Sequence, residues 1–232
     1  MTAAPGPHQP SPSQQVYYVE RKQPATPVTW ALLVINVLAW MAGLVWPRVP
    51  YDLALFPAMG LAEPWRLLSS SLVHFGIFHI GLNMLALWML GRALETLFGP
   101  IRYLVLYLGA VLGGSALTLM WSAMTGQGLD AMFGGASGGI FGMFGALVVL
   151  QAYKMIQAGN LLPILGLNLA ISFMLPGIGW QAHIGGLVVG AGIGWAIARR
   201  LRRETSDQTQ WIEIGLILAL TVGVLVASGM IA

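Results

Sequence analysis

The amino-acid sequence predicts an all-α protein that crosses a membrane several times. Of its 232 residues, 57% are hydrophobic and only 8% are charged, whereas a soluble domain carries roughly 25% charged residues. The chain also contains 30 glycines, which are frequent in membrane helices because small residues let helix backbones pack closely. A soluble protein of this composition could not cover its surface with polar groups, so we expect a polytopic membrane protein.

Seven segments are predicted to be spanning helices, because each approaches the roughly 20 mostly apolar residues that a span requires. They cover 28–46, 74–97, 101–124, 136–153, 160–176, 181–199 and 211–231. Proline and glycine lie at the breaks between them, as in Gly99-Pro100, and favour turns there. The proline-rich stretch 1–27 is typical of a disordered tail, and 200–210 is predicted to be a polar linker to a final helix within 211–232.

The basic residues predict the direction of the spans. Cytoplasmic loops carry an excess of Lys and Arg. With the N-terminus in the cytoplasm, only Arg48 and Arg66 fall outside. Nine basic residues then fall inside: Arg21, Lys22, Arg92, Arg102, Lys154, Arg199, Arg200, Arg202 and Arg203. We therefore expect a cytoplasmic N-terminus, an outer C-terminus and an odd number of spans, with 47–73 as a long outer loop lying partly in the interface.

Few ionisable or hydrogen-bonding groups stand out within the predicted spans, where each must find a partner or face a cavity. They are His74, His79 and Asn83 in the second span, Ser137 in the fourth and His183 in the sixth. The predicted topology places all of them near the outer ends of spans that run inward. His79 and Asn83 share one helical face, whereas His74 should point elsewhere. This convergence predicts a site a little below the outer surface.

Glycine stripes offer a way for the fourth and sixth spans to approach each other. Gly138 and Gly142 are four residues apart, as are Gly186 and Gly190, so each pair lines one face of its helix. If the two stripes face each other, the serine and the histidine come within hydrogen-bond reach. That is the geometry an activated serine nucleophile needs.

The residue types around this pair favour a serine-histidine dyad. None of the eight acidic residues lies inside a span at the outer depth; Asp130 is the nearest, and a triad including it is the second choice. The sequence contains no cysteine, so a thiol nucleophile is excluded. A metal site of His74, His79 and His183 is disfavoured because no acid or cysteine accompanies them, and we expect no metal and no cofactor.

Each residue also has a simpler explanation when it is taken alone. A serine in a glycine-rich membrane helix usually serves packing, and a membrane histidine often serves packing or a proton path. The run Gly135-x-Ser137-x-Gly139 matches the nucleophile elbow of soluble hydrolases, but no strand precedes it, so that match is rejected. The constellation as a whole is what favours a hydrolase.

Four segments of the chain resemble the rhomboid family of intramembrane proteases, over about residues 28–199. Their order, spacing and topology agree with the family pattern. The segments are Gly135-Ala136-Ser137-Gly138, Ala182-His183-x-x-Gly186-x-x-x-Gly190, His74-x-x-x-x-His79-x-x-x-Asn83 and Trp65-Arg66. The resemblance implies a six-helix catalytic bundle in 28–199, with one additional C-terminal transmembrane helix.

The resemblance also implies roles for the matching residues. Ser137 would be the nucleophile and His183 the general base, with His79, Asn83 and the Ser137 backbone N–H forming the oxyanion hole. The cap over the site would be 177–182, and substrate would approach beside the fifth span.

Three further positions match the family less directly. Glu95 corresponds to a structural acidic position, and Arg66 would stabilise the first outer loop. Phe141 stands where many bacterial members have a tyrosine. A phenylalanine keeps the stacking on the histidine but lacks the phenol hydrogen bond, so we expect it to tune the histidine rather than abolish activity.

The implied function is cleavage of peptide bonds in or next to transmembrane segments of membrane-protein substrates. We expect a plasma (inner) membrane location, contact with lipid and no nucleic-acid partner; the physiological substrate and the oligomeric state stay open. One alternative is a catalytically silent rhomboid-like protein that binds transmembrane segments. A transporter is disfavoured, because charged residues at mid-membrane are almost absent and no inverted repeat is evident.

Overall fold

The computed structural model describes residues 25–175 and 177–231, so nearly all of the predicted tail 1–27 lies outside the described residues. Within these ranges the long helices are α1 (Pro27–Val45), α4 (Ile77–Phe98), α5 (Pro100–Thr125), α6 (Ser137–Ala152), α7 (Leu161–Met174), α8 (Trp180–Leu201) and α9 (Asp207–Ile231). Short helices α2 (Arg48–Leu53), η1 (Pro57–Met59), α3 (Arg66–Ser69) and η2 (Ser70–Leu72) fold the first loop. The prediction of an all-α membrane fold is confirmed.

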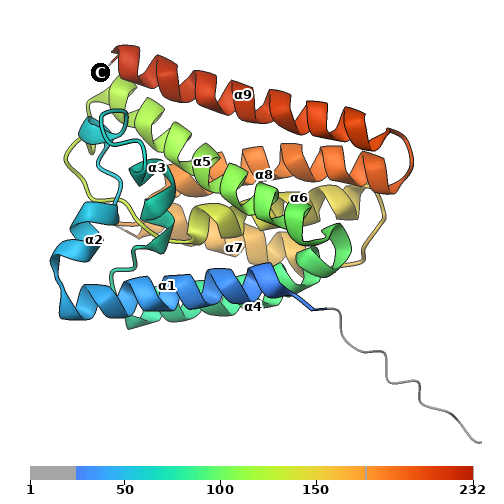
Figure 1. Cartoon of the computed structure of the whole chain (residues 1–232), viewed down its shortest axis with the longest axis horizontal. Helices are drawn as coiled ribbons and strands as arrows, with labels where there is room; N and C mark the ends of the chain where they lie inside the picture. The colour runs from blue at the N-terminus through green and yellow to red at the C-terminus, as the bar shows by residue number, and fades with distance from the viewer. Residues whose placement is uncertain (1–24, 176, 232) are drawn as a thin grey trace, which may run out of the picture.

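The helices form one bundle with α5 and α8 at its centre (Figure 1). Helix α8 packs most extensively against α6 and α5, and α9 lies along α5 and α8. Helix α1 packs against α4 on the opposite side of the bundle. The first six long helices therefore form the bundle, in which the glycine-rich helices α6 and α8 pack against each other, and α9 is added at its edge.

Each predicted span corresponds to one of these helices, but their lengths differ. Five helices are long and apolar enough to cross a membrane: α1, α4, α5, α8 and α9. Helices α6 and α7 are apolar but have only 16 and 14 residues, fewer than the roughly 20 of a full span. The short α6 begins at Ser137, so the chain that precedes it descends into the bundle.

Two predicted boundaries are wrong. The second span was expected to begin at 74, but α4 begins at Ile77, because the chain from Val73 to Gly76 is tied to the loop before α6 rather than coiled. The final helix begins at Asp207 instead of 211. Ser206 caps its first turn by accepting a hydrogen bond from the Thr209 N–H (3.0 Å), a capping pattern that favours a helix start. The predicted linker 200–210 is thereby shortened.

The contact between α6 and α8 depends on glycine. A Cβ atom added to Gly186 would lie 2.1 Å from the Gly138 carbonyl oxygen, and one added to Gly190 would lie 2.3 Å from the Gly142 Cα. Both distances are far below a van der Waals contact, so no larger residue fits without separating the helices. The predicted facing of the two glycine stripes is confirmed.

Glu95 anchors the start of α1. Its buried carboxylate accepts hydrogen bonds from the N–H groups of Val28 (2.9 Å) and Thr29 (2.8 Å) and from the Thr29 hydroxyl (2.7 Å). The first N–H groups of a helix have no partner within it, and the positive end of the helix dipole favours a carboxylate. Glu95 thus ties the C-terminal end of α4 to the start of α1.

Arg66 organises the first loop from inside. It is 4% exposed, and its Nη1 donates to the carbonyl oxygens of Tyr51 (2.7 Å) and Ala54 (2.8 Å). Its Nε forms an ion pair with Glu63. Next to it, Leu55 forms an isolated antiparallel bridge with Phe133. The loop is therefore a folded unit attached to the segment that leads to Ser137.

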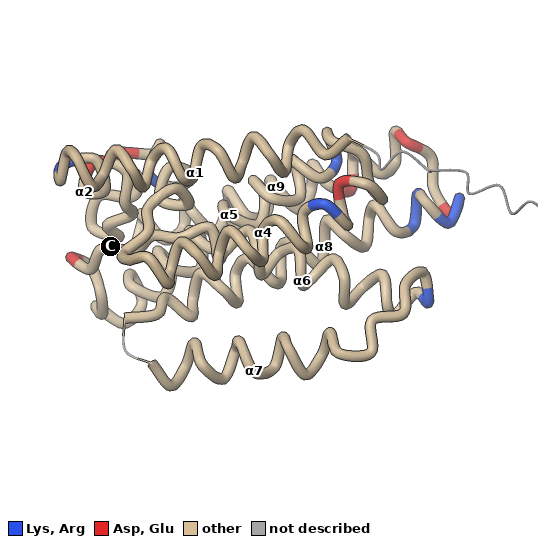
Figure 2. The backbone as a smooth tube through the Cα atoms, turned by 90° about the horizontal axis from the view of Figure 1, so that it is seen from below, with Lys and Arg blue, Asp and Glu red and all other residues tan. Residues whose placement is uncertain are grey.

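Most of the basic residues gather at one end of the bundle. Figure 2 shows Lys and Arg concentrated where α8 ends and α9 begins, with few charges along the middle of the described helices. Ion pairs at this end connect Arg102 and Arg200 with Asp207, Arg202 with Glu204, and Arg199 with Glu213. The bundle therefore has the charge distribution of a membrane protein with one basic face.

The replacement Gly186→Ala should destabilise the bundle, because the new methyl group overlaps the backbone of α6. Overpacking of this kind costs about 1–3 kcal/mol, and we expect a lower thermal unfolding midpoint in detergent. Gly192→Ala on the same helix is the matched control, since its Cβ would meet only the flexible Ile217 side chain at 3.4 Å. Equal unfolding midpoints for the two variants would contradict the glycine contact.

Candidate active site

Ser137 lies at the first position of α6, on a turn that only glycine permits. Gly135 has φ = 136°, a conformation that residues with a side chain rarely adopt. A Cβ at Gly135 would also lie 2.9 Å from His79 Nε2 and 3.5 Å from Ser137 Oγ. The glycine therefore leaves room for the histidine of α4 to approach the serine of α6. The N–H of Gly135 donates to the Ser70 carbonyl (2.9 Å) and holds the turn in place.

His183 and Ser137 are in direct contact. The distance from His183 Nε2 to Ser137 Oγ is 2.7 Å, which is a normal hydrogen-bond length. His183 lies in the first turn of α8 and is 8% exposed. The buried Phe141 ring stacks on its imidazole, with centroids 4.2 Å apart and planes 8° from parallel. The imidazole is thus held between a ring on one face and a serine at its edge.

The other imidazole nitrogen meets a residue that sequence analysis missed. His183 Nδ1 lies 2.7 Å from the hydroxyl of Ser172 on α7, and that hydroxyl also bonds the Asn168 carbonyl (2.7 Å). Serine in a membrane helix commonly bonds its own preceding turn, so the sequence offers no signal that singles out Ser172. Its importance appears only once α7 is placed beside α8.

The imidazole of His79 lies against Gly135, two residues before Ser137. The Phe75 N–H donates to His79 Nδ1 (3.4 Å), which leaves the proton on Nε2, the atom that faces Gly135. Asn83 lies one turn further along α4, is buried, and donates one amide N–H to the His79 carbonyl (2.8 Å). Its second amide N–H stays available for a ligand. The structure brings His79 beside Ser137 and places Asn83 just below it on the same helix.

His74 corrects an expectation. It was predicted to share the helix of His79 and to point elsewhere, but it precedes α4 and its ring lies 5.0 Å from that of His79. Its Nδ1 donates to the Leu72 carbonyl (3.3 Å), and its Nε2 accepts from the Ala136 N–H (3.5 Å).

The charge state of His74 suits this arrangement. Burial, together with the neighbouring His79 imidazole, lowers the pKa of His74 to about 4. The ring is therefore neutral at neutral pH, with one nitrogen free to accept a hydrogen bond. His74 ties the segment before α4 to the residue that precedes Ser137.

The sequence offered two alternatives to the serine-histidine dyad, a triad that includes Asp130 and a metal site made of histidines. The triad with Asp130 is not formed, because the nitrogen of His183 that it would need is bonded to Ser172 and Asp130 is exposed. Among residues 25–175 and 177–231, no three His, Cys, Asp or Glu side chains are grouped to hold a metal ion.

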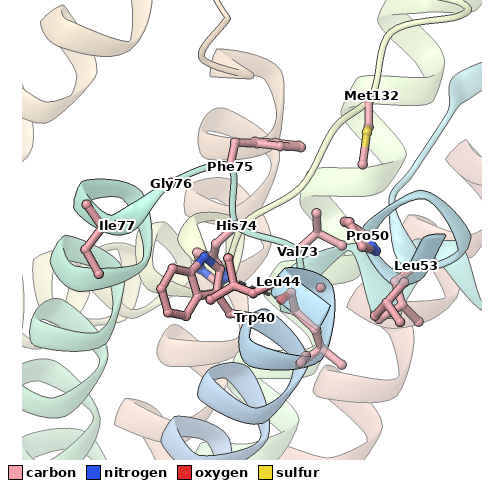
Figure 3. Close-up of a pocket in the computed structure, with 14 residues that line it drawn as sticks. Trp40, Leu44, Pro50, Leu53, Val73, His74, Phe75, Gly76, Ile77 and Met132 are labelled. Carbon is pink, nitrogen blue, oxygen red and sulfur yellow. Dashed lines mark hydrogen bonds between the residues drawn. The ribbon is translucent and has the colours of Figure 1, made fainter. Parts of the chain in front are cut away.

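A cavity of about 400 Å³ lies beside the site rather than at it. Figure 3 shows side chains of α1, of α2, of the segment before α4 and of the start of α4 around it, among them Trp40, Leu44 and Ile77. His74 also lines it, but Ser137 and His183 do not. Since the lining is almost entirely apolar, the cavity lacks the polar groups that hydrolysis requires.

A family model described as the rhomboid domain matches residues 61–200. This range is more than half of the chain and contains Ser137, His183, His79 and Asn83. The chain belongs to the rhomboid family. The resemblance recognised in the sequence motifs is therefore confirmed.

Rhomboid relatives occur in bacteria and plants. The "Rhomboid protease GluP" of Bacillus subtilis is 36% identical over 168 residues, which cover 70% of this chain and 31% of that protein. The "RHOMBOID-like protein 2" of Arabidopsis thaliana is 33% identical, and the match covers 71% of this chain and 49% of that protein. The "Putative rhomboid protease YdcA" of B. subtilis is 26% identical, and the match covers 77% of this chain and 92% of that protein. The chain thus spans less than half of the length of the first two.

Replacing Phe141 with Leu should slow the reaction of Ser137 with a fluorophosphonate probe, because the stacked ring no longer holds His183. An aromatic pair contributes about 0.5–1.5 kcal/mol beyond its buried area, so we expect a two- to tenfold loss of rate, on the order set by that energy. Phe144→Leu is the control, since Phe144 is also buried in α6 and contacts Phe141 rather than His183. Equal rates for the two variants would contradict a role for the stack.

Proposed function

We propose that this rhomboid protein is an intramembrane serine endopeptidase that cleaves peptide bonds in or next to transmembrane segments. The observation that carries the proposal is the 2.7 Å contact between His183 Nε2 and Ser137 Oγ. A serine hydroxyl is a weak nucleophile until a base accepts its proton. The proposed base, His183, is stacked on Phe141 and buried, which supports this role.

In the proposed reaction, Ser137 Oγ attacks the carbonyl carbon of the substrate peptide bond while His183 Nε2 takes its proton. His183 then protonates the leaving amine, and the acyl-enzyme forms. Water then attacks the ester carbonyl while His183 takes its proton. His183 passes that proton to Ser137 Oγ as the ester bond breaks, which releases the carboxylic acid product and restores the serine.

The proposed oxyanion hole collects donors from two helices. The Ser137 N–H is in the first turn of α6, where it has no acceptor within the helix and the dipole is positive. His79 contributes Nε2–H, and Asn83 contributes its second amide N–H. Donors fixed before the reaction stabilise the developing negative charge without reorganisation.

We further propose that the N-terminus lies in the cytoplasm, the C-terminus outside, and the active site toward the outer face of the plasma (inner) membrane. The basic end of the bundle in Figure 2 supports this direction, because cytoplasmic loops are enriched in Lys and Arg. The first turns of α4, α6 and α8, which carry the site, then lie near the opposite face. Substrates are membrane proteins with accessible transmembrane segments.

Replacing Ser137 with Ala should abolish cleavage of a model transmembrane substrate by the purified protein, with a loss of about 10⁴-fold or more. The same variant should not label with a fluorophosphonate, whereas the wild-type protein should label at Ser137. Ser122→Ala, which removes another buried hydroxyl, is the control and should cleave normally. Undiminished cleavage by Ser137→Ala would refute the proposal, and a wild-type protein that neither cleaves nor labels would favour the silent binding protein.

The proposed orientation can be tested with single cysteines, because the sequence contains none. Gln127 lies in the exposed turn after α5, and Arg203 lies in the exposed turn after α8. Each of these residues is replaced by cysteine in a separate variant, Gln127→Cys and Arg203→Cys. A membrane-impermeant maleimide added to intact cells should label the first variant and leave the second unlabelled until the cells are lysed. The reverse pattern would show the opposite orientation.

A further inference from the structure

We propose that Ser172 is a positioning residue, whose hydroxyl fixes the tautomer and the orientation of His183 and so takes the place of an acid in a Ser137–His183–Ser172 chain. The inference rests on the proposed function and deepens it. It also identifies α7 as the helix that carries the third member of the chain.

The direction of the hydrogen bonds follows from counting protons. A serine hydroxyl has one proton and two lone pairs. Ser172 Oγ donates its proton to the Asn168 carbonyl at 2.7 Å, so toward His183 Nδ1, also at 2.7 Å, it can only accept. His183 therefore carries its proton on Nδ1. Its Nε2 is left unprotonated and faces Ser137 Oγ, which is the state a general base needs.

The surroundings of Ser172 indicate that this contact is what holds it inside. Ser172 is 3% exposed, whereas its neighbours Ile171, Phe173 and Met174 are 40%, 57% and 78% exposed. The buried residues of α7 are otherwise two leucines in its first half, Leu161 and Leu165. In the second half of α7, Ser172 is therefore the buried residue that faces the bundle. Its hydroxyl contacts the imidazole of His183.

No carboxylate competes for this position. The buried acidic side chain among the described residues is Glu95, and its carboxylate is occupied by the start of α1. A neutral hydroxyl orients an imidazole but stabilises its charged form less than a carboxylate does. We therefore expect a smaller effect than the loss of a triad acid would have, of about fivefold, since one hydrogen bond contributes about 1 kcal/mol.

The arrangement couples α7 to the chemistry. Figure 2 shows α7 along one outer edge of the bundle, and among the described helices it packs mainly against α6 and α8. His183 keeps its orientation only while the outer end of α7 stays against α8. A substrate segment that displaces this end of α7 would release Nδ1, so the helix must return to its place before Ser137 is fully activated.

The test compares two variants of the full-length protein with one control. Ser172→Ala removes the hydroxyl, and Ser172→Thr retains it, since a threonine hydroxyl also bonds the preceding turn of a helix. Ser228→Ala is matched in residue type, burial and local bonding: Ser228 is 2% exposed and bonds the Leu225 carbonyl at 2.7 Å, but lies on α9. The measurements are the rate constant of fluorophosphonate labelling, and kcat and KM on a transmembrane substrate.

We expect Ser172→Ala to lower the labelling rate constant and kcat about fivefold with KM unchanged, and Ser172→Thr and Ser228→Ala to stay within about twofold of the wild type. The final labelled fraction reports how much protein is folded, so unfolding cannot imitate a slower rate constant. A wild-type rate constant for Ser172→Ala would overturn the inference, and so would equal losses in the Ala and Thr variants. If the wild-type protein itself does not label at Ser137, the proposed function fails instead.

Discussion

The close contact between the backbones of α6 and α8 is the constraint on which the rest of the structure depends. Lipid is as apolar as a leucine side chain, so membrane helices gain little from burying apolar surface and associate through close packing. Gly138 and Gly142 on one helix meet Gly186 and Gly190 on the other with no side chain between them. This contact sets the distance between the two helix starts, and with it the distance between Ser137 and His183.

Around that contact, each polar group of the site is held by a named partner. His183 is bonded at both nitrogens and stacked on Phe141. His79 is oriented through its Nδ1, and the segment before Ser137 is tied to His74 and Ser70. In a medium of low dielectric constant an unpaired polar group is costly. The same pairing that avoids this cost also fixes the protonation states that the proposed acyl transfer requires.

Much of the fold follows from local pattern. Helices appear where about 20 apolar residues run together, and they end at Gly99, where φ is 79°, and at Gly126, which adopts the left-handed conformation. The start of α9 was predicted too late in the chain. The cap that begins the helix is a single side chain, Ser206, which does not stand out within a polar stretch. His74 was assigned to a helix because its apolar neighbours extend the periodic segment. Its true place depends on a contact with Ala136, 62 residues further along the chain.

The sequence by itself was sufficient to predict the membrane class, the helices and the glycine stripes, because composition, periodicity and short motifs indicate them. Its motifs also singled out Ser137, His183, His79 and Asn83, whose catalytic roles stay a prediction. The residue that bonds His183 Nδ1, Ser172, could not be predicted from the sequence. Ser172 lies on an apolar helix like many other serines, and nothing within α7 shows which neighbour it faces. Only the packing of α7 against α8 makes it a hydrogen-bond partner, since a contact between distant segments depends on how their helices are rotated and aligned.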